Sequence, residues 1–192
     1  SFEEQGVAKL DAVADAFADA GATVETRLVF THDEAQTFDR VADETEADLI
    51  VHLNPAMAAD DLLVALHGAV AAERIGTVVA GLVDHTDTTV HLLEVAGPTE
   101  DTLNLLDRAE RALRDAGIDP ARITTEELQS DGPVNAIAEA ARDVDAIVLG
   151  ERAPDWRELV FGDFEERVAE ASLGAVLVVR PAAADAADSD ET

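Results

Sequence analysis

Residues 145–180 read DAIVLGERAPDWRELVFGDFEERVAEASLGAVLVVR and carry the strongest fold signal in the chain. Two short, continuous apolar runs, AIVLG and AVLVV, lie near the two ends of this stretch. Such runs are typical of strands buried on both faces, and the residues between them are numerous enough for a crossover helix, which we predict at 162–173. The stretch therefore predicts parallel strands in an α/β sheet that helices cover on both faces.

A similar succession of helix and strand occurs earlier in the chain. DAVADAFADAG at 11–21 is similar to DRAERALRDAG at 107–117, and DLIVHL at 48–53 is similar to DAIVLG at 145–150. Internal duplication of this extent predicts two similar structural units in tandem, each with a doubly wound parallel sheet.

We place a first repeat at 1–84, a second repeat at 85–181 and a disordered acidic tail at 182–192. The apolar stripe of the first helix has helical spacing and consists of Val7, Leu10, Val13, Ala14 and Phe17. Further helices are expected at 33–47, 58–74 and 132–144. Strands are expected at 23–30, 48–53, 76–82, 121–129, 145–150 and 174–180, and an extra strand at 88–96 is expected to form a hairpin with 76–83.

The charge of the chain is strongly negative, because 13 Lys and Arg face 42 Asp and Glu, for a net charge of −29. Lys9 is the only lysine. An acidic, lysine-poor surface suits molar salt, where a Debye length of about 3 Å removes the self-repulsion. We therefore interpret the chain as a protein of an extreme halophile, with binding of cationic partners as the alternative. The same charge disfavours binding to nucleic acid or to an anionic membrane surface.

Several functional classes lack their signature residues in this sequence. Cysteine is absent, which excludes disulfides, thiolate metal sites and cysteine nucleophiles. There is no Gly-Lys-Ser/Thr phosphate loop, and none of the four serines lies in a nucleophile elbow. We interpret DHTD at 84–87 as a hairpin turn, with a metal site as the alternative. No apolar run approaches the ~18 residues that span a bilayer.

Residues 144–181, which read DAIVLGER…GDFEERVAEASLGAVLVVRP from Asp145 on, resemble the C-terminal third of the universal stress protein family. The resemblance extends over 88–181 and, more weakly, over 2–83. It implies a five-stranded parallel sheet, often present in tandem copies. Relative to this family, we expect both repeats to lack the first strand and the first helix.

The resemblance also implies a place for nucleotide, because some members bind ATP through Gly, two residues, Gly, nine residues, and then Gly-Ser or Gly-Thr. Backbone N–H groups at such glycines and at a helix N-terminus can approach phosphates. Gly150 matches the first glycine, Ala153 replaces the second, and only eight residues separate Ala153 from Gly162. Asp163 stands where the family has a hydroxyl, and we interpret it as a helix N-cap.

Two further residues of this loop have alternative interpretations. Arg152 can bind an anion or pair with nearby acids on the surface, and Trp156, the sole tryptophan, can stack on a base or cover the end of the sheet. The nucleotide site comprising Gly150, Arg152, Ala153, Gly162 and Asp163 is thus predicted to be degenerate. The family also carries an aspartate after its first strand, near the adenosine, which we expect the second repeat to lack together with that strand.

By this resemblance we expect a non-catalytic sensing or regulatory module in the cytoplasm, with no cofactor and with ATP or another nucleotide as the alternative. A second function stays open, because domains of this family occur fused to permeases and the sequence starts at Ser1. In this alternative, the chain is the soluble C-terminal regulatory domain of an amino-acid or cation transporter, on the cytoplasmic face of the membrane. The resemblance further implies antiparallel pairing of last strands. We predict that 77–82 and 175–180 associate in an internal pseudo-dimer, with a homodimer as the alternative.

Overall fold

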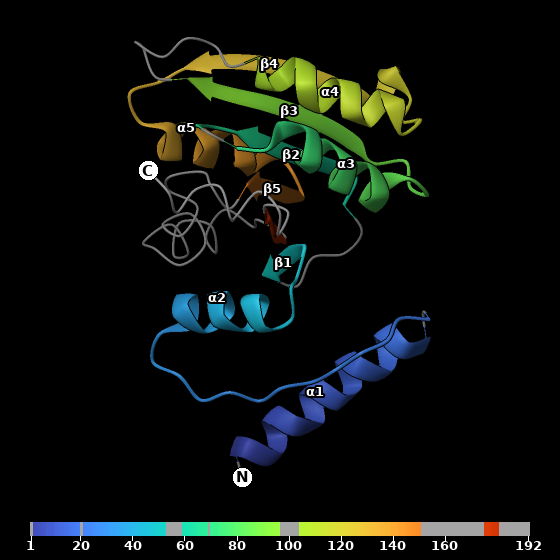
Figure 1. Ribbon diagram of the computed structural model, residues 1–192, viewed down its shortest axis with the longest axis vertical. Helices are drawn as coiled ribbons and strands as arrows, with labels where there is room; N and C mark the ends of the chain where they lie inside the picture. Colours follow the sequence, from blue (N-terminus) through green and yellow to red (C-terminus); the bar gives the residue numbers. More distant parts are fainter. Residues whose placement is uncertain are drawn as a thin grey trace. The chain divides into compact units, whose positions relative to one another are not determined.

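The computed structural model describes residues 2–19, 21–52, 59–68, 70–96, 104–150 and 175–180 (Figure 1). The chain divides into an N-terminal unit, Ser1–Thr37, and a C-terminal unit, Phe38–Thr192. Within the described residues, no helix is long and apolar enough to cross a membrane.

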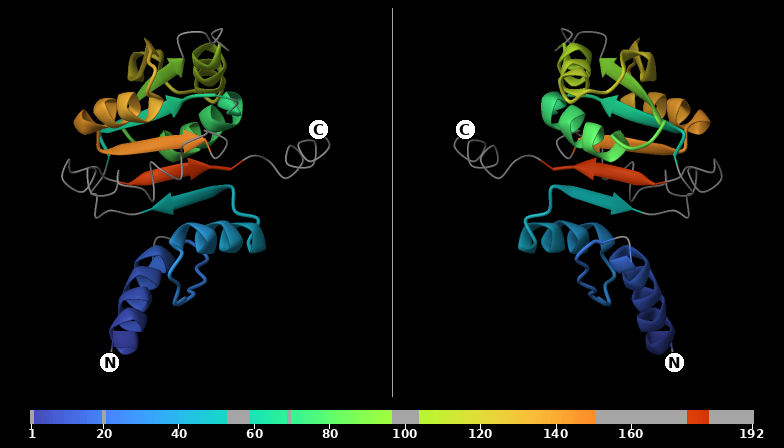
Figure 2. Two further views of the ribbon diagram at one scale, coloured as in Figure 1. Left: turned by 90° about the vertical axis from the view of Figure 1, so that its left-hand side faces the viewer. Right: turned by 90° about the vertical axis from the view of Figure 1, so that its right-hand side faces the viewer.

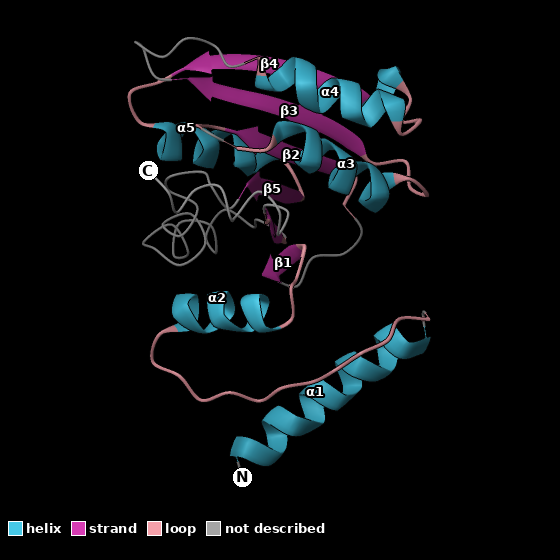
Figure 3. Ribbon diagram, viewed as in Figure 1, coloured by secondary structure: helices cyan, strands magenta, loops and turns pink. Residues whose placement is uncertain are grey.

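The N-terminal unit consists of helix α1 (Phe2–Asp19), a loop, and the first turn of α2 (Glu34–Glu44). The carboxylate of Asp33 accepts a hydrogen bond from the backbone N–H of Gln36 at 2.9 Å and so caps α2. The strand predicted at 23–30 is wrong: these residues are loop and pair with no described strand (Figure 3). The tandem repeat suggested the strand, but a strand needs a neighbour for its backbone groups, and the described residues supply none.

The C-terminal unit contains a six-stranded sheet with the order β1-β6-β5-β2-β3-β4. All neighbouring pairs are parallel except β1 and β6, which are antiparallel. The strands are β1 (Leu49–His52), β2 (Asp61–Leu66), β3 (Thr89–Ala96), β4 (Ile123–Gln129), β5 (Ala146–Gly150) and β6 (Val176–Val179). The predicted α/β class with a mostly parallel sheet is confirmed.

Helices cover both faces of this sheet (Figure 2). Helices α3 (Ala72–Val83) and α4 (Leu105–Asp115) follow successive strands in the direction from β2 to β4 and lie on one face. Helix α5 (Pro133–Ala140) connects β4 back to β5, in the opposite direction along the sheet. Because parallel crossovers are right-handed, this reversal places α5 on the other face.

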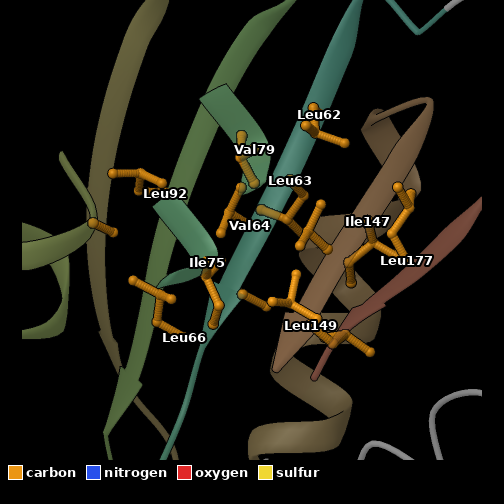
Figure 4. Packing of buried hydrophobic residues seen from close by; sticks show 14 of the residues in the cluster. Leu62, Leu63, Val64, Leu66, Ile75, Val79, Leu92, Ile147, Leu149 and Leu177 are labelled. Carbon is orange, nitrogen blue, oxygen red and sulfur yellow. The ribbon is translucent and has the colours of Figure 1, made fainter. Parts of the chain in front are cut away.

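The core lies between the sheet and the helices that cover it, and Figure 4 shows the part of it next to α3. Ile75 and Val79 of α3 are buried against β2 and β5, where Val64 and Leu149 are also fully buried. Gly76 lets α3 and α4 approach closely, since a Cβ atom there would lie 2.7 Å from the carbonyl oxygen of Ala109. Truncating a leucine or isoleucine of such a core to alanine costs about 2–5 kcal/mol.

Two further predicted elements are wrong. The segment 76–82, predicted to be a strand, belongs to α3, and 58–74, predicted to be a helix, contains β2. The buried positions of α3 recur at spacings of three and four residues, which is a helical period that its valines and glycines obscure. They are Ala72, Ile75, Gly76, Val79, Ala80 and Val83.

The positions of β2 and α3 also correct the expectation for residues 85–181. Strand β2 and helix α3 precede β3, and β2 pairs with both β3 and β5, so this sheet has a strand and a helix before residue 85. The strand predicted at 88–96 is confirmed as β3, but it pairs in parallel with β2 and β4 and forms no hairpin with 76–83. The turn at 84–87 therefore joins α3 to β3. The boundary predicted at 84/85 lies in this turn, and the six described strands form one sheet; tandem doubling is not confirmed and stays a prediction.

The last strand of the sheet, β6, has a partner other than the predicted one. Residues 77–82 are helical, and β6 instead pairs with β1, with Leu49 opposite Val179. The guanidinium group of Arg74 pairs with Asp48 at 2.5 Å, and that of Arg180 pairs with Asp43 at 2.5 Å. These two ion pairs tie the α2–β1 segment to α3 and to the end of β6. The predicted internal pseudo-dimer stays a prediction.

Candidate functional site

The order of the strands reverses at β2, and this point locates the candidate site. The chain runs from β2 to β3 and β4 on one side and later places β5 and β6 on the other side. In open α/β sheets, ligands bind beyond the carboxyl ends of the two strands at such a reversal. Here the two strands are β2 and β5, which pair with Ala65 opposite Leu149. The loop after β2, which begins at His67, and Gly150 at the end of β5 therefore lie at the same edge.

The side chain of His67 is held in a defined orientation at this edge. Its Nδ1 lies 2.7 Å from the carbonyl oxygen of Val95, at the end of the neighbouring strand β3. Because a carbonyl oxygen only accepts, Nδ1 carries the proton and donates it. In the neutral ring Nε2 is then the acceptor nitrogen. The ring is half-buried.

Gly150 is explained by a close approach of the loop that follows β2. A Cβ atom at position 150 would lie 2.8 Å from Cγ1 of Val70 and 3.1 Å from Cδ1 of Ile75. The loop between β2 and α3 therefore lies directly against the end of β5. Packing alone accounts for a glycine here, without the phosphate contact that the family resemblance implies.

Glu94 is a buried charged residue at the same edge of the sheet. It lies opposite Leu66 in the register of β2 and β3 and is only 2% exposed. Its Oε2 accepts a hydrogen bond from the backbone N–H of Leu106, in the first turn of α4, at 3.3 Å. A carboxylate is favourable at the positive end of a helix dipole. Glu94 thus occupies the helix N-terminus that could otherwise attract an anion such as phosphate.

The predicted nucleotide site is described only in part. Gly150 is at the edge described above, whereas Arg152, Ala153, Gly162 and Asp163 lie outside the described residues, as does the helix predicted at 162–173. The degenerate site therefore stays a prediction.

The sequence reasoning missed two functional candidates, His67 and Glu94. A signal for His67 is present, because DLLVALHG combines a short apolar run with a polar residue at its end, but the helix predicted over 58–74 conceals it. The loop His67-Gly68-Ala69-Val70 follows β2 in the sequence. This loop contains no aspartate.

A second polar cluster lies near the amino ends of the strands. The Nε2 atom of His91 lies 2.7 Å from Oδ1 of Asp61, and its Nδ1 lies 2.8 Å from Oγ1 of Thr124. These contacts join β2, β3 and β4. His91 is therefore a partly buried strand residue whose two ring nitrogens both have hydrogen-bond partners. Among the described residues, no three His, Asp or Glu side chains are placed to hold a metal ion.

Comparison with known proteins gives structural neighbours at low identity. A universal stress protein in complex with cAMP matches with a TM-score of 0.47 and 19% identity, over 64% of this chain and 98% of that chain. The hypothetical protein MJ0577 matches with a TM-score of 0.46 and 21% identity, over 64% of this chain and 96% of that chain. No family model matches the chain, and no curated protein matches it.

Proposed function

We propose that this chain is a non-catalytic regulatory module of the universal stress protein type, with a degenerate nucleotide site, from a halophile. The observation that carries the proposal is the reversal of strand order at β2, which brings His67 and Gly150 to one edge of the sheet. This is the edge where doubly wound sheets bind their ligands.

The polar groups at this edge support a structural role in place of catalysis. The Nδ1–H group of His67 is engaged by the carbonyl oxygen of Val95, and the carboxylate of Glu94 is buried against the first turn of α4. A general base needs a free acceptor within reach of a reacting proton and a neighbouring nucleophile. Within the part of the chain that the structure describes, neither side chain forms a hydrogen bond with a serine, threonine or lysine. The arrangement links the ends of β2 and β3 to each other and to the first turn of α4.

The same residues support weak rather than tight nucleotide binding. His67 follows β2 where the family has its adenosine-side aspartate, Val70 fills the space over Gly150, and Glu94 holds the N-terminus of α4. Asp163 replaces the hydroxyl of the glycine motif in the sequence. Each of these features either takes away a side chain or backbone site that could bind nucleotide, or adds a negative charge near the negative phosphate groups.

The proposal is tested by incubating the protein with ATP in molar KCl and measuring phosphate release, while the fluorescence of Trp156 reports binding. Trp156 is the only tryptophan and lies in the sequence between Gly150 and Gly162. We expect no phosphate above the protein-free control and no saturable fluorescence change at micromolar ATP or cAMP. Turnover of ATP that scales with protein concentration contradicts a non-catalytic module, and saturation at micromolar nucleotide contradicts a degenerate site.

A further inference from the structure

Residues 23–30, TVETRLVF, have the composition of a strand but no strand partner in the described chain. Valine, threonine and phenylalanine dominate the segment, and these residues favour sheets. Four of its large apolar side chains are exposed: Val24 (38%), Leu28 (40%), Val29 (36%) and Phe30 (70%). Among the described residues, no backbone–backbone hydrogen bond involves 23–30. The segment is therefore a candidate for pairing with a strand from another chain.

Helix α1 lies next to this segment and can form a second layer against it. A Cβ atom on Gly6 would lie 3.6 Å from Cδ1 of Leu28, so the segment lies along the helix within the N-terminal unit. The apolar stripe of α1 is also exposed, with Val7 at 43%, Val13 at 45% and Phe17 at 51%. A two-stranded ribbon is marginal alone but gains stability when it packs on a helix. The N-terminal unit thus presents a helix and a strand-forming segment that together leave apolar surface uncovered.

The sequence of the segment is complementary to itself in the antiparallel direction. If Thr26 lies opposite Thr26 of another copy, Glu25 lies opposite Arg27 and Val24 lies opposite Leu28, and the same pairs recur on the other side of the centre. Opposite charges, two threonines and two apolar side chains are all favourable cross-strand pairs. A two-fold axis requires this kind of self-complementary surface.

We propose that residues 23–30 pair antiparallel with the same residues of a second copy of this chain, about a two-fold axis at Thr26. The charge complementarity of Glu25 and Arg27 selects a second copy over an unrelated partner. Pairing adds hydrogen bonds between the backbones of the two segments and places Val24 and Leu28 of the two copies side by side. Molar salt screens the long-range repulsion between two acidic chains more strongly than it screens the attraction between opposite charges in direct contact. The pairs of Glu25 with Arg27 therefore remain favourable under these conditions.

A cysteine placed on the axis tests this pairing directly, because the natural chain has no cysteine. Directly opposed residues of antiparallel strands have Cα atoms about 4.5–5.5 Å apart, which lies within the range that a disulfide bridges. The full chain with Thr26→Cys is oxidised mildly in molar KCl and run on a denaturing gel without reductant. Thr125→Cys, on the exposed edge strand β4, is the matched control.

We expect Thr26→Cys to form a disulfide-linked dimer as the major species and Thr125→Cys to stay monomeric. A monomeric Thr26→Cys chain, or equal cross-linking of the two variants, overturns the proposal, the second because it shows random collision. Circular dichroism checks that both variants keep the sheet.

Exchange of the two charges gives an independent test by sedimentation equilibrium. Arg27→Glu creates two like-charged pairs across the axis and should weaken dimerisation by roughly tenfold. The double variant Glu25→Arg/Arg27→Glu restores opposite charges and should return the affinity to near that of the natural chain. If the double variant is no better than Arg27→Glu, the antiparallel register at Thr26 is wrong.

Discussion

The imidazole of His67 donates its Nδ1–H to the carbonyl oxygen of Val95 across 2.7 Å. This contact links the end of β2 to the end of β3 at the edge where the order of the strands reverses. It gives the histidine a structural task at the position that a ligand-binding residue would occupy.

Replacing His67 by alanine removes this donor and leaves the Val95 carbonyl without its side-chain partner. We expect the free energy of unfolding to fall by about 1 kcal/mol, the usual net value of such a hydrogen bond. Guanidinium unfolding measures the change, and His85→Ala is the control, because the His85 side chain is 93% exposed and its loss should change stability by less than ~0.5 kcal/mol. Equal effects of the two substitutions would count against a structural role for His67.

Gly150→Ala tests whether this glycine serves packing or phosphate binding. Its new Cβ atom would lie 2.8 Å from Val70, so we expect a loss of about 1–3 kcal/mol of stability, which Val70→Ala in the same chain partly restores. Gly81→Ala is the matched control in α3, since no atom lies within 4 Å of its Cβ position, and it should stabilise the helix by up to ~1 kcal/mol. Unchanged stability of Gly150→Ala would indicate that the loop does not lie against β5.

Stability should depend steeply on salt, because 42 acidic residues face only 13 Lys and Arg. At 0.01 M salt the Debye length is about 30 Å, so the carboxylates repel across the whole molecule, whereas at 1 M it is about 3 Å. We expect the melting temperature to fall on dialysis into low salt and to recover in molar KCl. For a chain of this size, each ~1 kcal/mol corresponds to roughly 2–4 °C.

Sucrose separates charge screening from general stabilisation in this experiment, because it stabilises folded proteins without screening charge. If sucrose restores the melting temperature as well as KCl does, or if the temperature is the same in low and molar salt, the halophilic interpretation fails.

The parts of the fold that the sequence predicted correctly have a clear local signal. The apolar runs of β5 and β6 contain no polar residue, and β3 has a long β-branched and apolar pattern. Helix α3 was mistaken for a strand because its small and β-branched residues, AERIGTVVAGLV, satisfy both patterns over a short window. Tertiary packing settles this ambiguity, through the close approach of Gly76 to Ala109 on α4.

The candidate site was less predictable than the sheet for a related reason. Gly150 could be found from the motif alone, but its contact with Val70 depends on β2 lying next to β5, which are 80 residues or more apart in the chain. A helix predicted over 58–74 conceals both His67 and the reversal of strand order at β2. Glu94 gave no signal, because a glutamate inside an apolar strand has meaning only when the N-terminus of α4 is known to lie beside it.

A calorimetric titration of the natural chain with ATP in molar KCl, beside the Asp163→Ser variant, tests the central claim of a degenerate nucleotide site most directly. We expect no binding heat from the natural chain at micromolar ATP. Asp163→Ser restores a hydroxyl donor and removes a like charge, so it should bind ATP more tightly by roughly a hundredfold. Micromolar binding of ATP by the natural chain that Asp163→Ser leaves unchanged would contradict the account.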